Sequence, residues 1–199
     1  MRIGGSAVFW RVKRGVDLGL SLALLPVLIG AGLCLLLLNP FLNPGRLLYF
    51  QPRVGRGDRL FVLIKFRTMR PAEGGARFAD AETHRIGRLG ACLRRYRIDE
   101  LPQLINVLRG EMSLIGPRPE QPEFAVEYGR ILPGYHLRHA VRPGLSGLSQ
   151  VRQGYTSDTS GTQRKLALDL RYIRQSGFRM EAYVFWRTLV TVASGFGAR

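Results

Sequence analysis

Hydrophobic residues follow one another without a charged residue over one long stretch near the start of the chain. This stretch runs from Leu18 to Leu38, which is 21 residues. As one straight helix it would be about 32 Å long, enough to cross a hydrocarbon layer of roughly 30 Å. It is longer than the apolar core of a signal peptide, and no clear small-residue cleavage site follows it. The pattern predicts a membrane segment rather than the buried helix of a soluble protein.

A proline and the flanking charges determine how this segment would lie in a membrane. Pro26 interrupts the run and removes a backbone N–H, so the pieces Leu18–Leu25 and Val27–Leu38 are each too short to cross alone. Basic residues flank both ends, and the positive-inside rule places each flank on the cytoplasmic side. Both conditions are met if the segment enters and leaves on one face. We therefore predict a re-entrant membrane helix broken at Pro26.

Beyond this segment the pattern predicts a mixed α and β domain. Asn39–Gly45 is rich in Asn, Pro and Gly, so we expect a linker there that separates an anchor (residues 1–39) from a domain (residues 40–199). Two short runs predict a β-hairpin, and the later apolar runs predict helices. The expected strands are Leu47–Gln51 and Leu60–Lys65, the expected loop is Glu73–Ala76, and the expected helices are Ile86–Tyr96, Leu101–Leu108, Pro122–Tyr128, Gln163–Gln175 and Glu181–Ala193. The predicted fold class is α+β, with a re-entrant helix followed by a compact, mostly helical domain that contains a small β-hairpin.

The chain is strongly basic. It has 30 Lys and Arg against 14 Asp and Glu, a formal net charge of +16. Such a surface attracts phosphate, which nucleic acids, anionic lipids and nucleotide substrates all carry. Two cysteines, Cys34 and Cys92, make no disulfide framework and indicate a reducing compartment. The histidines, at 84, 136 and 139, lack the spacing of zinc ligands, and we expect structural or hydrogen-bonding roles for them.

Candidate chemistry concentrates in Leu93–Pro119, where acids and arginines stand close to Pro and Gly. The adjacent carboxylates of Asp99 and Glu100 follow three arginines, and a Gly-Pro-Arg-Pro turn ends the stretch. Carboxylates are ligands that Mg²⁺ prefers, and arginines bind phosphate oxygens as a planar fork. Neighbours on a helix point about 100° apart, which favours a metal ligand or base beside a nucleophile over one ion shared by both. An alternative stays open, in which Asp99 caps the following helix and Pro102 lies in its first turn.

This stretch also resembles a known family. The segments Asp99–Leu104, Asn106–Leu114 and Ile115–Pro119 resemble DELPQL-x-NVL-[KR]-G-[DE]-MS-L-[IV]-GPRP, the core pattern of the bacterial sugar transferases. These are the monotopic phosphoglycosyl transferases that start membrane-linked glycan assembly. So long a match at fixed spacing is specific, and further matches extend it from about Lys13 to Arg187.

Three further elements support the resemblance, and two departures mark its limits. Lys65–Met69 resembles the family's KFRTM element, Arg142–Gly147 its RPG-[IL]-[ST]-G turn, and Asp169–Ile173 its D-L-x-Y-[IV] element. The family often has Ser-Pro where this chain has Leu25-Pro26. It usually continues with Trp-Ala where this chain has Leu148-Ser149. The resemblance implies the re-entrant anchor that the charges already predict.

The resemblance implies a set of site residues. Asp99 would be the nucleophile that forms a phosphosugar-enzyme, a known type of carboxylate catalysis. Glu100 would bind Mg²⁺, the expected cofactor, with Asp99 as a second candidate ligand. The candidates for binding substrate phosphates or the nucleotide are Lys65, Arg67, Arg94, Arg118 and Arg142.

The function that follows is that of a phosphoglycosyl transferase. We expect transfer of a sugar-1-phosphate from a nucleotide diphosphate sugar to polyprenol phosphate, with a UDP-sugar as the expected donor and UMP as the released product. The glycan could belong to an exopolysaccharide, a capsule, an O-antigen or a glycoprotein. The expected location is the bacterial inner membrane, with the catalytic domain on the cytoplasmic face in contact with anionic lipids. A homo-oligomer is left open.

The alternative is a membrane-tethered basic module that binds nucleic acid or anionic lipid without chemistry. The net charge supports it. Against it, no helix-turn-helix or RNA-binding signature appears, and the specific pattern centres on acids. We therefore expect an enzyme, with no nucleic-acid partner.

Overall fold

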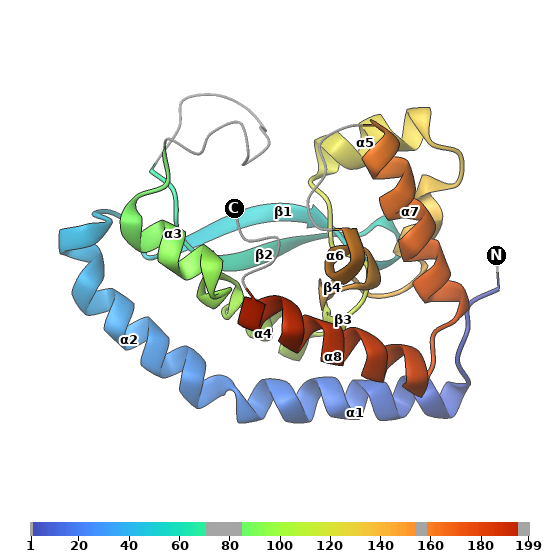
Figure 1. Ribbon diagram of the computed structural model, residues 1–199, viewed down its shortest axis with the longest axis horizontal. Helices are drawn as coiled ribbons and strands as arrows, with labels where there is room; N and C mark the ends of the chain where they lie inside the picture. The colour runs from blue at the N-terminus through green and yellow to red at the C-terminus, as the bar shows by residue number, and fades with distance from the viewer. Residues whose placement is uncertain (1, 71–84, 154–158, 195–199) are drawn as a thin grey trace.

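The computed structural model describes residues 2–70, 85–153 and 159–194, and it has a bent N-terminal pair of helices below a mixed α and β body (Figure 1). The elements are α1 (Ala7–Ala23), α2 (Leu25–Leu42), β1 (Leu48–Val54), η1 (Arg56–Asp58), β2 (Leu60–Phe66), α3 (Arg88–Arg95), η3 (Ile98–Glu100), α4 (Gln103–Arg109), β3 (Ser113–Ile115), α5 (Pro122–Ile131), η4 (Tyr135–Ala140), β4 (Gly144–Ser146), α6 (Leu148–Gln153), α7 (Thr159–Arg174) and α8 (Phe178–Ser194). The expectation of a mostly helical chain with a small hairpin is confirmed. His84 and the loop expected at Glu73–Ala76 lie outside the described residues.

The N-terminal helices meet at a bend close to the predicted one. α1 begins at Ser6, whose Oγ accepts a hydrogen bond from the Phe9 N–H (3.1 Å). The break lies at Leu24, and Pro26 occupies the first turn of α2. A proline is tolerated there because first-turn N–H groups have no intrahelical partner. The proline therefore begins the second helix, and the bend falls two residues earlier than predicted.

α2 carries most of the exposed apolar surface of this pair. Within the described residues it is the one helix long and apolar enough to cross a membrane, with 18 residues and a mean hydropathy of 2.1. Leu37 is 72% exposed and Phe41 is 84% exposed. A helix of this composition is stable in water only when it is covered, so α2 fits the predicted anchor, whose re-entrant course stays a prediction.

The predicted linker starts later than expected. α2 continues through Asn39 and Pro40 to Leu42. The Asn39 Nδ2 donates to the Gly45 carbonyl (2.6 Å), and the Asn43 Nδ2 donates to the Arg67 carbonyl (2.9 Å). The Asn39 amide thus binds the segment that follows the helix, and the Asn43 amide holds that segment against the end of β2. The prediction of a turn from Asn39 onward was wrong for its first four residues.

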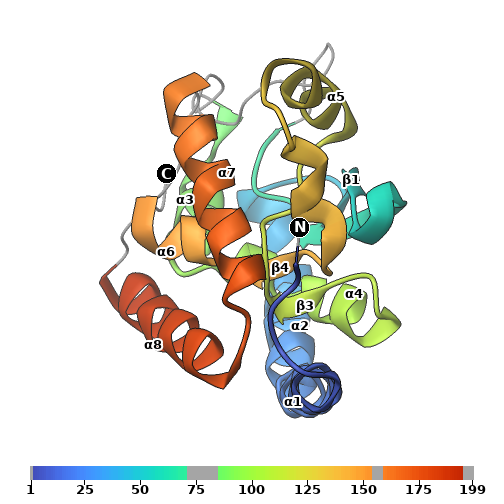
Figure 2. The same ribbon diagram turned by 90° about the vertical axis from the view of Figure 1, so that its right-hand side faces the viewer.

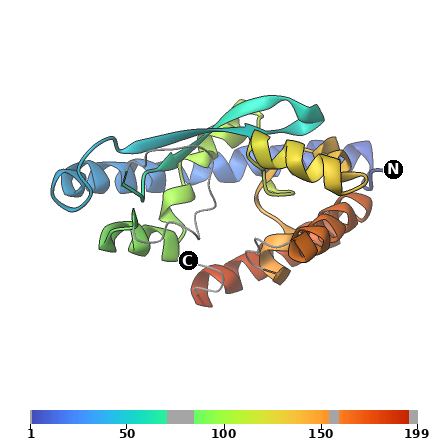
Figure 3. The same cartoon turned by 90° about the horizontal axis from the view of Figure 1, so that it is seen from above.

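The hairpin forms as predicted and is slightly longer. β1 and β2 pair antiparallel from Leu48 opposite Phe66 to Val54 opposite Leu60. Figure 3 shows the hairpin along one side of the molecule and α3 and α8 along the other. The buried face of β2 packs on α4 through Phe61, Leu63 and Val107, so the hairpin fixes the position of the helix that follows the acidic pair.

A second sheet was not predicted. β3 and β4 are three-residue strands that pair parallel, with Ser113 opposite Gly144 and Ile115 opposite Ser146. A Cβ on Gly144 would lie 2.1 Å from the Gly116 nitrogen, so these two backbone segments approach this closely only because residue 144 is a glycine. This contact joins the Gly-Pro-Arg-Pro turn to the RPG turn. Figure 2 shows α1 end-on beneath this small sheet and α4.

Candidate active site

The acidic pair lies on a tight turn between α3 and α4. Arg97 has a φ of 57°, a left-handed conformation that is uncommon outside glycine. Arg97 is the N-cap of η3. The side chains of Asp99 and Glu100 turn inward, leaving these residues 6% and 7% exposed. Pro102, not Asp99, is the N-cap of α4, and no side chain caps that helix. The helix-cap explanation of Asp99 is therefore wrong.

Glu100 is held in an ion pair with the predicted arginine. The Arg118 Nη2 donates to the Glu100 Oε1 at 2.7 Å, and the Arg97 Nη1 lies 3.7 Å from the same oxygen. Burial opposes the charged form, but Arg118 first and then Lys65 and Arg97 outweigh it and hold the pKa of Glu100 well below its usual range. Glu100 is thus ionised at neutral pH and anchors the guanidinium of the turn.

Asp99 is in the opposite state. Burial, and then the charge of Glu100, raise the pKa of Asp99 to about 6, although Lys65, Arg94 and Arg118 act to lower it. Its Oδ1 is buried and accepts no hydrogen bond from the described residues. A buried carboxylate oxygen without a hydrogen-bond partner is costly, so its presence here requires an explanation. At neutral pH the carboxyl group of Asp99 is therefore largely ionised, although one of its oxygens is buried and has no hydrogen-bond donor among the described residues.

Lys65 is brought to the acidic pair by the hairpin. The Asn106 side chain on α4 binds the edge of β2 that does not pair with β1, since its Oδ1 accepts from the Ile64 N–H (3.1 Å) and its Nδ2 donates to the Val62 carbonyl (2.8 Å). Burial, with Arg118 and then Arg53, lowers the pKa of Lys65 to about 8. An ammonium in such a site gains most from a bound anion.

The other predicted phosphate ligands are divided. The positive charge of Arg94 acts to lower the pKa of Asp99, and the Arg94 Nε donates to the Thr68 Oγ1 (3.1 Å). Arg67 donates to carbonyls of the connection between α2 and β1, including that of Arg46 (2.7 Å). Arg142 donates its Nε to the Gly110 carbonyl (2.8 Å) at the far end of α4. The structure brings Lys65, Arg94 and Arg118 to the acidic pair, and it uses Arg67 and Arg142 elsewhere.

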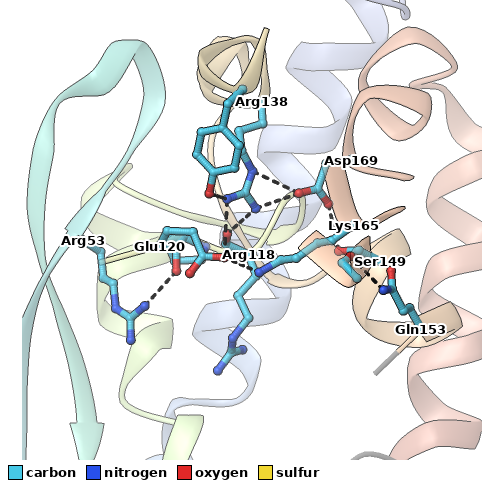
Figure 4. Close-up of polar contacts among 11 residues, drawn as sticks. Arg53, Arg118, Glu120, Arg138, Ser149, Gln153, Lys165 and Asp169 are labelled. Atoms are coloured by element: carbon cyan, nitrogen blue, oxygen red, sulfur yellow. Dashed lines mark hydrogen bonds and ion pairs between the residues drawn. The ribbon is translucent and has the colours of Figure 1, made fainter. Parts of the chain in front are cut away.

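The sequence did not single out the group that supports the Arg118 turn (Figure 4). Arg138 is 2% exposed, and its Nη2 donates to the Arg118 carbonyl (2.9 Å) and to the Asp169 Oδ2 (2.6 Å). The other Asp169 oxygen accepts from the Ser149 hydroxyl (2.8 Å). Glu120 lies beside this pair, and Lys165 contacts it. Arg138 and Asp169 are 31 residues apart, so no local sequence pattern indicates that they pair. The Asp169 motif was recognised as part of the family resemblance, but its partner was not.

The site has the donors that Mg²⁺ requires, without forming a closed protein cage. Among the described residues no group of three or more His, Cys, Asp or Glu side chains gathers as a metal site. Mg²⁺ is usually held by one or two carboxylates, with waters and substrate phosphates as the other ligands. The unpartnered Asp99 oxygen and the adjacent Glu100 fit that description.

Residues 8–195 match the family described as bacterial sugar transferase. The chain is 40% identical over 196 residues to the UDP-N-acetylgalactosamine-undecaprenyl-phosphate N-acetylgalactosaminephosphotransferase of Aeromonas hydrophila, which covers 98% of this chain and 46% of that protein. It is 37% identical over 189 residues to the exopolysaccharide production protein PSS of Rhizobium leguminosarum, covering 90% of this chain and 94% of that protein.

A third relative carries a different sugar in its name. The chain is 41% identical over 154 residues to the UDP-glucose:undecaprenyl-phosphate glucose-1-phosphate transferase of Caulobacter vibrioides, covering 75% of this chain and 55% of that protein. The chain thus spans about half the length of the Aeromonas and Caulobacter relatives. The match over residues 8–195 includes the acidic pair and both turns, and the chain belongs to the bacterial sugar transferase family.

Proposed function

We propose that this chain transfers a sugar-1-phosphate from a UDP-sugar to polyprenol phosphate and releases UMP. The observation that carries the proposal is the buried, unpartnered Asp99 oxygen close to three cations, Lys65, Arg94 and Arg118. A diphosphate ester supplies the negative charge that such a group of cations lacks. The relatives of Aeromonas hydrophila and Caulobacter vibrioides are named for the same class of reaction on undecaprenyl phosphate, with N-acetylgalactosamine and glucose as the sugars.

The proposed reaction has two displacements at one phosphorus. An Asp99 oxygen attacks the phosphorus that bears the sugar, and the bond from that phosphorus to the bridging oxygen breaks. UMP leaves with the bridging oxygen and its electron pair. It needs no proton to leave, because the second pKa of a phosphate monoester is about 6. An oxygen of polyprenol phosphate then attacks the phosphosugar-enzyme, and the Asp99 carboxylate is released.

The residues around Asp99 have distinct tasks in this scheme. Arg118 and Lys65 neutralise the phosphate oxygens as negative charge moves to the leaving group. Glu100 holds the Arg118 guanidinium in place (2.7 Å). Asp99 and Glu100 would hold Mg²⁺, which supplies further charge neutralisation on the diphosphate. Arg94, in the last turn of α3, adds a third positive charge close to Asp99.

The test is turnover on a panel of UDP-sugars. Full-length protein in detergent or nanodiscs, given polyprenol phosphate, should release UMP from one or a few of the sugars and form a lipid-linked product. Release of more than one UMP per chain without polyprenol phosphate would contradict the proposal, and so would the absence of UMP release with the whole panel. Salt-sensitive binding of nucleic acid without turnover would support the non-catalytic module instead.

Metal dependence is the second expected result. If Asp99 and Glu100 bind Mg²⁺ with the diphosphate, EDTA should reduce turnover to background, and added Mg²⁺ should restore it. Ca²⁺ is a useful comparison, because it is larger and tolerates irregular coordination. Full activity in the presence of the chelator would show that Asp99 and Glu100 do not need a bound metal ion for turnover.

We also propose that the chain is a re-entrant membrane protein with its catalytic part on the cytoplasmic face. The bend at Leu24 and the exposed apolar surface of α2 support this topology. Single cysteines placed at Ser6 and Arg56, in a chain in which Cys34 and Cys92 are replaced, should both resist an impermeant thiol reagent in intact cells. Both should react after the membrane is opened. Reaction of only one of them from outside would indicate a spanning helix.

A further inference from the structure

A second basic site lies on the α1 side of the body, apart from the acidic pair. A cavity of about 260 Å³ opens between α1, β3 and the segment before β4. It is lined by Ile3, Trp10, Lys13, Arg14, Asp17, Arg56, Ser113, Ile115, Ala140, Val141, Arg142 and Tyr172. The charged groups that shift the pKa of Asp99 are Glu100, Lys65, Arg94 and Arg118, and none of them lines this cavity. The two sites therefore have separate sets of side chains.

The charges of this cavity do not balance. Four cations face one carboxylate, that of Asp17, which accepts hydrogen bonds from the Ser113 hydroxyl (2.7 Å) and the Leu114 N–H (3.2 Å). Lys13 is neutralised by Glu181 at 2.7 Å. Within the described residues, none of the three arginines pairs with a carboxylate. Three guanidiniums thus remain around one opening.

Local structure explains two of these arginines but not the third. Arg14 donates to the Val107 carbonyl (2.8 Å) and Arg142 to the Gly110 carbonyl (2.8 Å), so both cap the carbonyl end of α4. Arg56 reaches the cavity from the hairpin turn. Its guanidinium makes no hydrogen bond or ion pair with any of the described residues. Burial lowers the pKa of Arg142, the positive charges of Arg14 and Arg56 lower it further, and Asp17 acts to raise it.

We propose that this cavity binds the phosphate group of a phosphate ester, separately from the substrates of the acidic pair. Guanidiniums are suited to phosphate because their N–H groups match its oxygens in a planar fork. Trp10, Ile115 and Val141 form an apolar wall beside the charges, which suits an ester with an organic group. The same chemistry is offered by the head group of an anionic phospholipid and by a soluble phosphate ester.

Trp10 provides a direct readout. The chain has two tryptophans, and the other, Trp186, is 66% exposed on α8. In full-length Trp186→Phe protein in detergent, indole emission comes from the cavity wall alone. Inorganic phosphate, exchanged against chloride at constant ionic strength, should change this emission saturably.

Two arginine variants distinguish phosphate binding in this cavity from attraction of phosphate by the net positive charge of the protein. Arg56→Gln should weaken phosphate binding about tenfold, the expected loss of one charged hydrogen-bonding partner. Arg59→Gln removes the same charge from the same exposed turn but does not line the cavity, and it should bind phosphate as before. Asp99→Asn should also keep the change in Trp10 emission on phosphate binding, because Asp99 belongs to the acidic pair and does not line this cavity.

Vesicles identify the source of the phosphate. If phosphatidylglycerol in phosphatidylcholine vesicles changes Trp10 emission and suppresses the response to inorganic phosphate, the occupant is a lipid head group. If the response to inorganic phosphate persists in those vesicles, the occupant is a soluble ester. Either result supports the proposal. No saturable response in detergent, or equal weakening in Arg56→Gln and Arg59→Gln, would overturn it.

Discussion

Replacing Asp99 with Asn is expected to abolish both turnover and covalent labelling of the enzyme by a UDP-sugar. In wild-type protein without polyprenol phosphate, a sugar-labelled UDP-sugar should release at most one UMP per chain and leave label on the protein. Asparagine keeps the size of the side chain but has no charged oxygen to attack phosphorus. Removal of a covalent nucleophile costs about 10³-fold or more in kcat, so the variant should be near background.

The pH dependence of labelling gives an independent check on the same residue. The pKa of Asp99 is raised to about 6 by burial and by Glu100. Above pH 6 the carboxylate is ionised and competent, and below pH 6 protonation removes the nucleophile. The rate of label formation should therefore fall as the pH drops through about 6. A plateau that continues to pH 5 would mean that Asp99 does not act as the attacking group.

A matched control exists in the hairpin turn. Asp58 has a φ of 61° and a side chain that is 64% exposed, and asparagine is well tolerated in that conformation. Asp58→Asn makes the same chemical change outside the site and should keep labelling and turnover. Intersecting initial-rate patterns, together with single-turnover activity in Asp99→Asn, would instead favour direct attack by the lipid phosphate. Asp99 would then be a metal ligand.

The sequence predicted the parts of the fold whose signals are local. The hairpin follows from two β-prone runs around a Gly-rich turn, and the amphipathic helices follow from apolar spacing. The bend was predicted near Pro26 because a proline ends or begins a helix, but the chain turns at Leu24, since a first-turn proline needs no N–H partner. The linker was predicted too early because α2 tolerates Pro40 and continues to Leu42, and because the Asn43 side chain bonds to Arg67, which lies outside that segment.

The candidate site shows the same division. Asp99, Glu100 and Arg118 were identified from a contiguous motif, and Lys65 from a second motif 34 positions before Asp99. The sequence could not show that Arg142 differs in role from Arg118. The motifs that contain these two arginines do lie side by side in the small parallel sheet, so their backbones are close although their side chains are not used in the same place. Only the hydrogen bond to Gly110 shows that the Arg142 side chain points away from the acidic pair.

Arg138→Met is expected to be the most destabilising single change in this region. Arg138 and Asp169 are 2% and 1% exposed, and their Nη2 and Oδ2 atoms lie 2.6 Å apart. Removing the guanidinium leaves a buried carboxylate without its cation, which costs about 3–5 kcal/mol. The variant should unfold at a clearly lower temperature than wild-type protein in the same detergent. Arg130→Met, an exposed substitution on α5, should have little effect.

A second substitution tests whether the lost charge partner is the cause. In Arg138→Met/Asp169→Asn the carboxylate is gone as well, so part of the stability should return, as expected for two groups that interact directly. Activity need not return with it, because the double variant still lacks the N–H that binds the Arg118 carbonyl at 2.9 Å. Without that contact the turn that carries Arg118 is less well positioned against Glu100, and kcat should stay low while the protein is folded. If the double variant were no more stable than Arg138→Met, the buried ion pair would not be what stabilises this region. If it regained full kcat, Arg138 would stabilise the fold without positioning Arg118.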